Sequence, residues 1–112
     1  MAIHAAKNDE EGREVCTINS FYREALTKAG VHHFDDLPLG VVLCVVDLVD
    51  VVGTGIYKGI VSQKEEQFGD WSSGRWAWRL SNLRVLVKPI PYRGMQGFWE
   101  WPVELKDLEF KP

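Results

Sequence analysis

Apolar positions recur along the chain with two different periods, and these periods predict several strands and one main helix. Residues 2–6 are short and apolar, as in a strand. After a cap at Thr17 or Asn19, apolar positions recur every three or four residues as far as Gly30, which predicts a helix. Residues 40–52 are β-branched and nearly continuously apolar. This run predicts a central strand, covered on both faces where it begins.

The stretch from residue 65 to residue 80 combines the signature of a tight loop with that of a strand. Its first half contains Gly69 and Gly74 beside residues that favour turns. In its second half, side chains of two kinds alternate, as on the two faces of a strand. One set is Trp76, Trp78 and Leu80, and the opposite set is Arg75, Ala77 and Arg79. Either this segment walls a ligand site, or the tryptophans are core residues and the arginines are solvated.

Beyond residue 80 the apolar positions change phase, which predicts a break or bulge at Ser81–Asn82. Such bulges let small barrels turn corners. Pro89 and Pro91 are expected to end the strand, and residues 93–102 to form a short helical turn that plugs one end of the barrel. The elements together predict an α+β fold in one domain, residues 1–112: a small mixed β-barrel with one main helix packed on it.

Composition and charge restrict the partners that this domain can have. The net charge of −3 argues against non-specific binding to a polyanion, yet residues 69–94 carry five basic side chains against Asp70 alone. That segment is either a locally basic face or an ordinary solvated strand face. The longest apolar run, residues 41–52, is interrupted by two aspartates and is too short to span a bilayer. We therefore expect a soluble, cytoplasmic protein with no membrane partner.

The C-terminal half carries a pattern of short motifs that resembles a known family. The motifs are Phe68-Gly69-Asp70 through Trp78, Leu80-Ser81-Asn82, Pro89-Ile90-Pro91, Arg93-Gly94, Gln96-Gly97 and Trp99. With residues 2–7 and 40–52, they resemble the ASCH domain of the PUA-like superfamily. The Gly-x-Lys-x-x-Glu-x-Arg element typical of that family has no counterpart here. We therefore expect an N-terminally incomplete PUA-like domain, with an exposed sheet edge that invites a homodimer.

The resemblance implies a ligand related to RNA or to nucleosides. On that basis we expect a module that binds RNA or a nucleotide around the 68–79 loop and strand. Arg75 and Arg79 would contact phosphates, the loop at Gly69 would approach the ligand, and Trp71 or Tyr92 would stack on a base.

The alternative that the resemblance implies is an enzyme, either a hydrolase of a modified nucleoside of the acetylated-cytidine type or a small ribonuclease. Glu66 would then act as a general base, with Lys7 facing the same cleft. The competing interpretation is that Glu66 belongs to a solvated loop and Lys7 to the surface. Adjacent histidines near residue 32 are weak evidence for a metal, so we expect neither a metal nor a cofactor.

Overall fold

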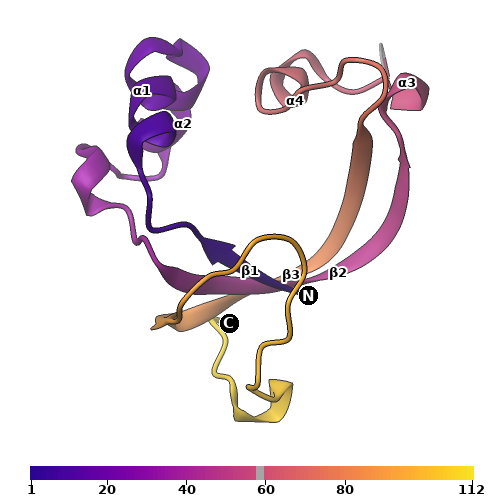
Figure 1. The fold of residues 1–112 in the computed structure, drawn as a ribbon. Coiled ribbons are helices and arrows are strands. Elements are labelled where there is room, and N and C mark those ends of the chain that lie inside the picture. Colours follow the sequence, from indigo (N-terminus) through magenta and orange to yellow (C-terminus); the bar gives the residue numbers. More distant parts are fainter. Residues whose placement is uncertain (58–59) are drawn as a thin grey trace.

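The computed structural model describes residues 1–57 and 60–112, and within them it has the predicted α+β fold (Figure 1). The strands are β1 (Ala2–Ala5), β2 (Val41–Gly53) and β3 (Trp76–Pro91). The helices are α1 (Glu10–Ile18), α2 (Ser20–Lys28), α3 (Thr54–Tyr57) and α4 (Gln63–Gln67), with 3-10 turns η1 (Phe34–Asp36) and η2 (Leu105–Asp107).

The strands form an antiparallel sheet in the order β1-β2-β3, which confirms that the apolar run is the central strand. β1 pairs only with the first part of β2, from Val41 to Val45. Beyond that overlap, β2 and β3 continue as a curved two-stranded ribbon as far as the Gly53–Trp76 pair (Figure 1). We call the outer part of this ribbon, Leu48–Gly53 of β2 with Trp76–Leu80 of β3, the arm.

The predicted irregularity in β3 is confirmed at Asn82. The register between β2 and β3 shifts between Val45 and Asp47, because β3 contains one extra residue there. Asn82 has a φ of +52°, a left-handed conformation that asparagine tolerates better than most residues. The change of phase in the apolar pattern therefore reflects a bulge.

The barrel expected from the sequence is not closed among the described strands. The sheet is open and wholly antiparallel, with β1 and β3 at its two edges. β3 ends at Pro91, as predicted, with Pro89 still inside the strand; an edge strand tolerates proline because one side of it needs no ladder hydrogen bonds. Residues 93–102 form no helix and run instead as an irregular segment.

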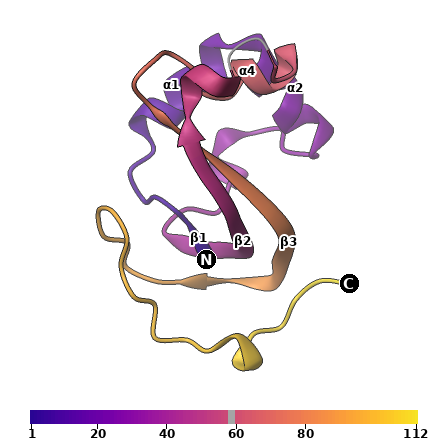
Figure 2. The same ribbon diagram turned by 90° about the vertical axis from the view of Figure 1, so that its right-hand side faces the viewer.

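The main predicted helix is present, but it does not pack on the sheet. Asn19 caps α2, since its side-chain oxygen accepts the backbone N–H of Phe21 at 2.9 Å. α2 packs against α1, a helix that the apolar pattern did not predict, and the Tyr22 ring meets the Phe68 ring at 4.9 Å. In both views the helices lie above the sheet and residues 103–112 lie below it (Figures 1 and 2).

The buried core lies where all three strands overlap. The apolar side chains buried in the described residues are Val42, Val45, Val46 and Leu86. β1, the inner part of β2 and the middle of β3 supply and cover this cluster, and Phe110 adds an isolated bridge to Leu86. The helices and the arm are therefore held mainly by contacts outside the core.

Candidate functional site

A buried threonine ties the loop before β3 to the end of β2. Thr54 is 2% exposed, and its hydroxyl donates to the Ser72 carbonyl oxygen at 2.6 Å. Its backbone N–H donates to the Arg75 carbonyl oxygen at 3.0 Å. These bonds fix the loop at the tip of the arm. In the sequence, this anchor is marked only by a threonine between two glycines.

Within the loop, Asp70 organises its neighbours through both carboxylate oxygens. One oxygen accepts the Ser72 hydroxyl at 2.6 Å and the Ser72 backbone N–H at 3.0 Å. The other pairs with the Arg75 Nε at 2.8 Å. The hydrogen bonds from Ser72, helped by the charge of Arg75, lower the pKa of Asp70 below its ordinary value. The loop therefore carries a fixed negative charge with a guanidinium group beside it.

The loop borders an open surface hollow of about 380 Å³. Its lining residues are Glu66, Gly69, Asp70, Trp71 and Ser72. Trp71 donates its Nε1 hydrogen to the Glu65 carbonyl oxygen at 3.4 Å, and its ring meets Tyr57 edge-on at 6.2 Å. A Cβ at Gly69 would lie 3.1 Å from the Trp71 Nε1, so glycine lets the loop backbone approach the indole closely.

The short helix α4 brings Glu66 to this hollow. Residues 65–67, expected as part of a loop, belong to α4, whose Ser62 cap accepts the Glu65 backbone N–H at 3.1 Å. The signal was present in the sequence as serine followed three residues later by glutamate, the spacing of a capping box.

The structure brings together four of the seven predicted site residues. Glu66, Gly69 and Trp71 line the loop hollow, and Arg75 pairs with its Asp70. Arg79 lies nearby on the arm, opposite Asp50 in the ladder.

The remaining two residues lie at the far end of β2. The side chain of Lys7 lies against Gly40, and the Tyr92 backbone N–H donates to the Gly40 carbonyl oxygen at 3.2 Å. Gly40 directly precedes β2, whereas the loop hollow follows the last residues of that strand. Glu66 and Lys7 therefore do not face one cleft, and Tyr92 does not stand beside Trp71.

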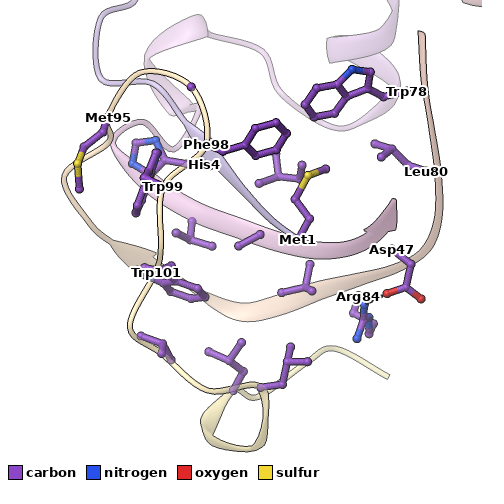
Figure 3. Close-up of a pocket in the computed structure, with 18 of the residues that line it drawn as sticks. Met1, His4, Asp47, Trp78, Leu80, Arg84, Met95, Phe98, Trp99 and Trp101 are labelled. Carbon is purple, nitrogen blue, oxygen red and sulfur yellow. Dashed lines mark hydrogen bonds and ion pairs between the residues drawn. The ribbon is translucent and has the colours of Figure 1, made fainter. Parts of the chain in front are cut away.

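A second and larger hollow, of about 900 Å³, lies between the sheet and the segment formed by residues 92–108, which we call the strap. Its walls are mainly apolar and aromatic, and Figure 3 shows Trp78 and Leu80 on β3 across from Phe98 on the strap. Trp78 and Phe98 stack with ring centroids 5.0 Å apart. Tyr92 stacks on Trp99 at 5.3 Å, so this tyrosine packs within the strap.

The strap hollow contains few polar groups. The His4 Nε2 donates to the Tyr92 carbonyl oxygen at 2.7 Å. At the opposite end, Asp47 pairs with Arg84 at 2.7 Å (Figure 3). Within residues 1–57 and 60–112, the buried Trp101 Nε1 has no hydrogen-bond partner. The sequence signalled this hollow only through the density of aromatic residues between positions 93 and 102.

The fold and the two hollows define the class of this molecule as a small α+β domain with an open three-stranded antiparallel sheet. No protein-family model, no curated protein and no solved structure matches the chain, so the likeness to the ASCH domain stays a prediction. In the part of the chain that the structure describes, no helix has the length and apolarity needed to cross a membrane. The same residues contain no group of three or more His, Cys, Asp or Glu side chains placed to hold a metal ion.

Proposed function

We propose that this domain binds RNA or a nucleotide at the loop hollow. The nucleoside part would lie against Trp71, and phosphate groups would contact Arg75 and Arg79. The observation that carries this proposal is the grouping of Glu66, Gly69 and Trp71 around one hollow with Arg75 held 2.8 Å from Asp70. A volume of about 380 Å³ lies within the range of small-ligand sites.

The chemistry of the hollow suits the nucleoside part rather than the phosphate. Glu66 and Asp70 present carboxylate oxygens, which accept hydrogen bonds from ribose hydroxyls or from the amino group of a base. The same carboxylates repel a phosphate group, which is therefore directed to the arginines outside. Trp71 supplies an aromatic surface beside these acceptors, as in many sites that bind unpaired bases.

The two arginines differ in how freely they can take a phosphate. Arg79 is exposed and has no ion pair among the described residues, so it can bind phosphate without losing a partner. Arg75 must first exchange Asp70 for phosphate. We therefore expect Arg79 to contribute more to affinity, and binding to weaken with salt as counterions are released.

The test is a fluorescence-anisotropy titration of a short labelled single-stranded RNA at low and moderate salt. Arg79→Ala should weaken binding and lower the dependence of log affinity on log salt by about 0.7, the contribution of one phosphate on a single strand. Arg23→Ala, which removes an exposed arginine from α2, is the matched control and should bind as the parent does. Unchanged affinity of Arg79→Ala at low salt would contradict the site.

The alternative of a hydrolase has less support. Its two proposed catalytic side chains, Glu66 and Lys7, lie beyond opposite ends of β2. The RNA recovered after the titration, analysed for chain length, distinguishes binding alone from cleavage.

A further inference from the structure

The protein exposes more surface than a compact monomer of its mass. Its solvent-accessible area is 8706 Å² for 12.8 kDa, whereas the scaling for folded monomers gives about 6,300 Å². The radius of gyration, 15.4 Å, likewise exceeds the value of about 13 Å that is typical of this chain length. The excess of about 2,400 Å² is larger than the surface that each partner buries in an ordinary stable complex.

Part of this surface is one apolar face of the arm. Residues directly opposite in an antiparallel ladder share a face, and Leu48 is opposite Leu80 while Val51 is opposite Trp78. These four side chains are each 40–45% exposed, and Trp76, on the same face of β3, is 70% exposed. Phe98 stacks on Trp78 but leaves the rest of the face open.

The other face of the arm is different in character. Its ladder pairs are Asp50 with Arg79, and Val52 with Ala77. The arm is therefore amphipathic, and the face proposed for phosphate binding is not the apolar one. Contiguous exposed apolar patches on soluble proteins often mark interaction surfaces.

The apolar face favours a partner that is itself uncharged and apolar. The charged groups beside it, Asp47 and Arg84, neutralise each other at 2.7 Å. Nucleic acid would need free cations here, and Arg79 points to the opposite face. A second copy of the same face is itself an apolar, uncharged surface, so it can cover this face without burying an unpaired charge. Tryptophan, phenylalanine and methionine, which are enriched in protein interfaces, surround the adjoining strap hollow.

From these observations we infer that the apolar face of the arm, together with the strap hollow, is the interface of a two-fold symmetric homodimer. The same patch on each copy meets the other, as symmetry requires for an isologous contact. A contact through this face would remove part of the excess surface of each chain from solvent. At the β1 edge of the sheet, only four residues are available for pairing with another strand. The inference does not depend on nucleotide binding.

The test is sedimentation equilibrium of the full chain over a range of concentrations, with native mass spectrometry to detect any co-purified ligand. The parent should be dimeric. Leu80→Glu places a charge on the face and should weaken the dimer by about 100-fold. Trp76→Ser removes a side chain that is 70% exposed in one chain, so it should leave each chain folded and weaken the dimer by about 10-fold.

Ile18→Glu is the matched control, because Ile18 is 69% exposed on α1 and lies outside the face. It should dimerise as the parent does. Three results would overturn the inference: a monomeric parent at every concentration, with or without a bound small molecule; a dimer that tolerates the arm variants; or an open-ended assembly larger than a dimer. If Leu80→Glu fails to fold, Trp76→Ser alone decides between these outcomes.

Discussion

The inner and outer halves of β2 are both rich in valine and leucine, although Asp47 and Asp50 lie in the outer half, and their surroundings differ. In the inner half, Val42, Val45 and Val46 are 1–5% exposed. In the outer half, Leu48 and Val51 are 40% and 42% exposed. The inner half is covered because β1, β3 and the strap meet there, whereas the outer half extends beyond β1 and pairs with β3 alone. An apolar run in the sequence therefore indicates that these side chains tend to be buried. It does not indicate whether the same chain or another molecule buries them.

Because of this difference in burial, the two halves of β2 contribute differently to the stability of the folded chain. A fully buried valine or leucine contributes about 1.5–3 kcal/mol relative to an exposed one. The inner half of β2 obtains this stabilisation within one chain. The outer half obtains little of it until the arm is covered, so its contribution should depend on protein concentration if the cover is a second copy.

The largest expected effect compares one valine from each half. Val42→Ala should lower the free energy of unfolding by about 2–3 kcal/mol, because it leaves a cavity in the core. Val51→Ala should cost only about 0.5 kcal/mol in dilute protein, where the arm is uncovered. Urea unfolding at low and high protein concentration measures both values. Equal costs in dilute protein would show that the two halves do not differ as described.

The second prediction concerns the strap, which covers the inner half. A Cβ at Gly94 would lie 2.6 Å from the His4 Cε1 and 2.9 Å from its Nδ1. The ring cannot easily move, since its Nε2 is bonded to the Tyr92 carbonyl oxygen. Gly94→Ala should therefore cost about 1–3 kcal/mol, measured by urea unfolding.

The double variant Gly94→Ala with His4→Ala provides the control for this clash. It should be more stable than the sum of the two single effects predicts, since removing the ring removes the clash. Strictly additive effects would mean that Gly94 is needed for another reason.

Local signals in the sequence predicted those parts of the fold that depend on local structure. The continuous β-branched run predicted β2, the helical spacing after a cap at Thr17 or Asn19 predicted α2, and the change of phase predicted a break or bulge at Ser81–Asn82. The open sheet and the extended strap could not be predicted in this way. Both depend on contacts between distant residues, such as the stacking of Tyr92 on Trp99 and the bond from His4 to Tyr92.

The same distinction applies to the candidate site. Glu66, Gly69, Trp71 and Arg75 lie within ten residues of one another, so a single loop brings them together. The positions of Lys7 and Tyr92 relative to this loop depend on the topology of the whole sheet. One sequence does not provide that topology, because the pairing of distant strands has no local signature.

The third prediction tests the anchor of the loop at the tip of the arm. Thr54→Val removes the hydroxyl that donates to the Ser72 carbonyl oxygen and leaves that oxygen without this partner. We expect a loss of about 1 kcal/mol in the free energy of unfolding, together with weaker binding of RNA. Thr17→Val is the control, because Thr17 makes a similar bond to Arg13 on the exposed surface of α1. If Thr54→Val and Thr17→Val bind RNA with the same affinity, the loop held by Thr54 does not contribute to RNA binding.

The smallest expected effect concerns pH and the bulge, where the two halves of the ribbon join. The hydrogen bond from Asn82 and the charge of Arg84 lower the pKa of Asp47 below its ordinary value of 3.8. The unfolded chain therefore takes up this proton at a higher pH than the folded chain does. The stabilisation is present above the ordinary pKa and is lost as the pH falls through the lowered, folded-state value.

Asp47→Asn removes this titration, so its urea midpoint should fall less than that of the parent between about pH 5 and pH 2. The difference should be small because the carboxyl is exposed, and added salt should reduce it further by screening. Asp50→Asn, on the opposite face of the arm, provides a comparison in which this bulge is intact. If the urea midpoints of Asp47→Asn and the parent fall equally as the pH is lowered, the ion pair at the bulge contributes nothing measurable to stability. The left-handed backbone conformation of Asn82 is then the feature that shapes the bulge between the covered and uncovered halves.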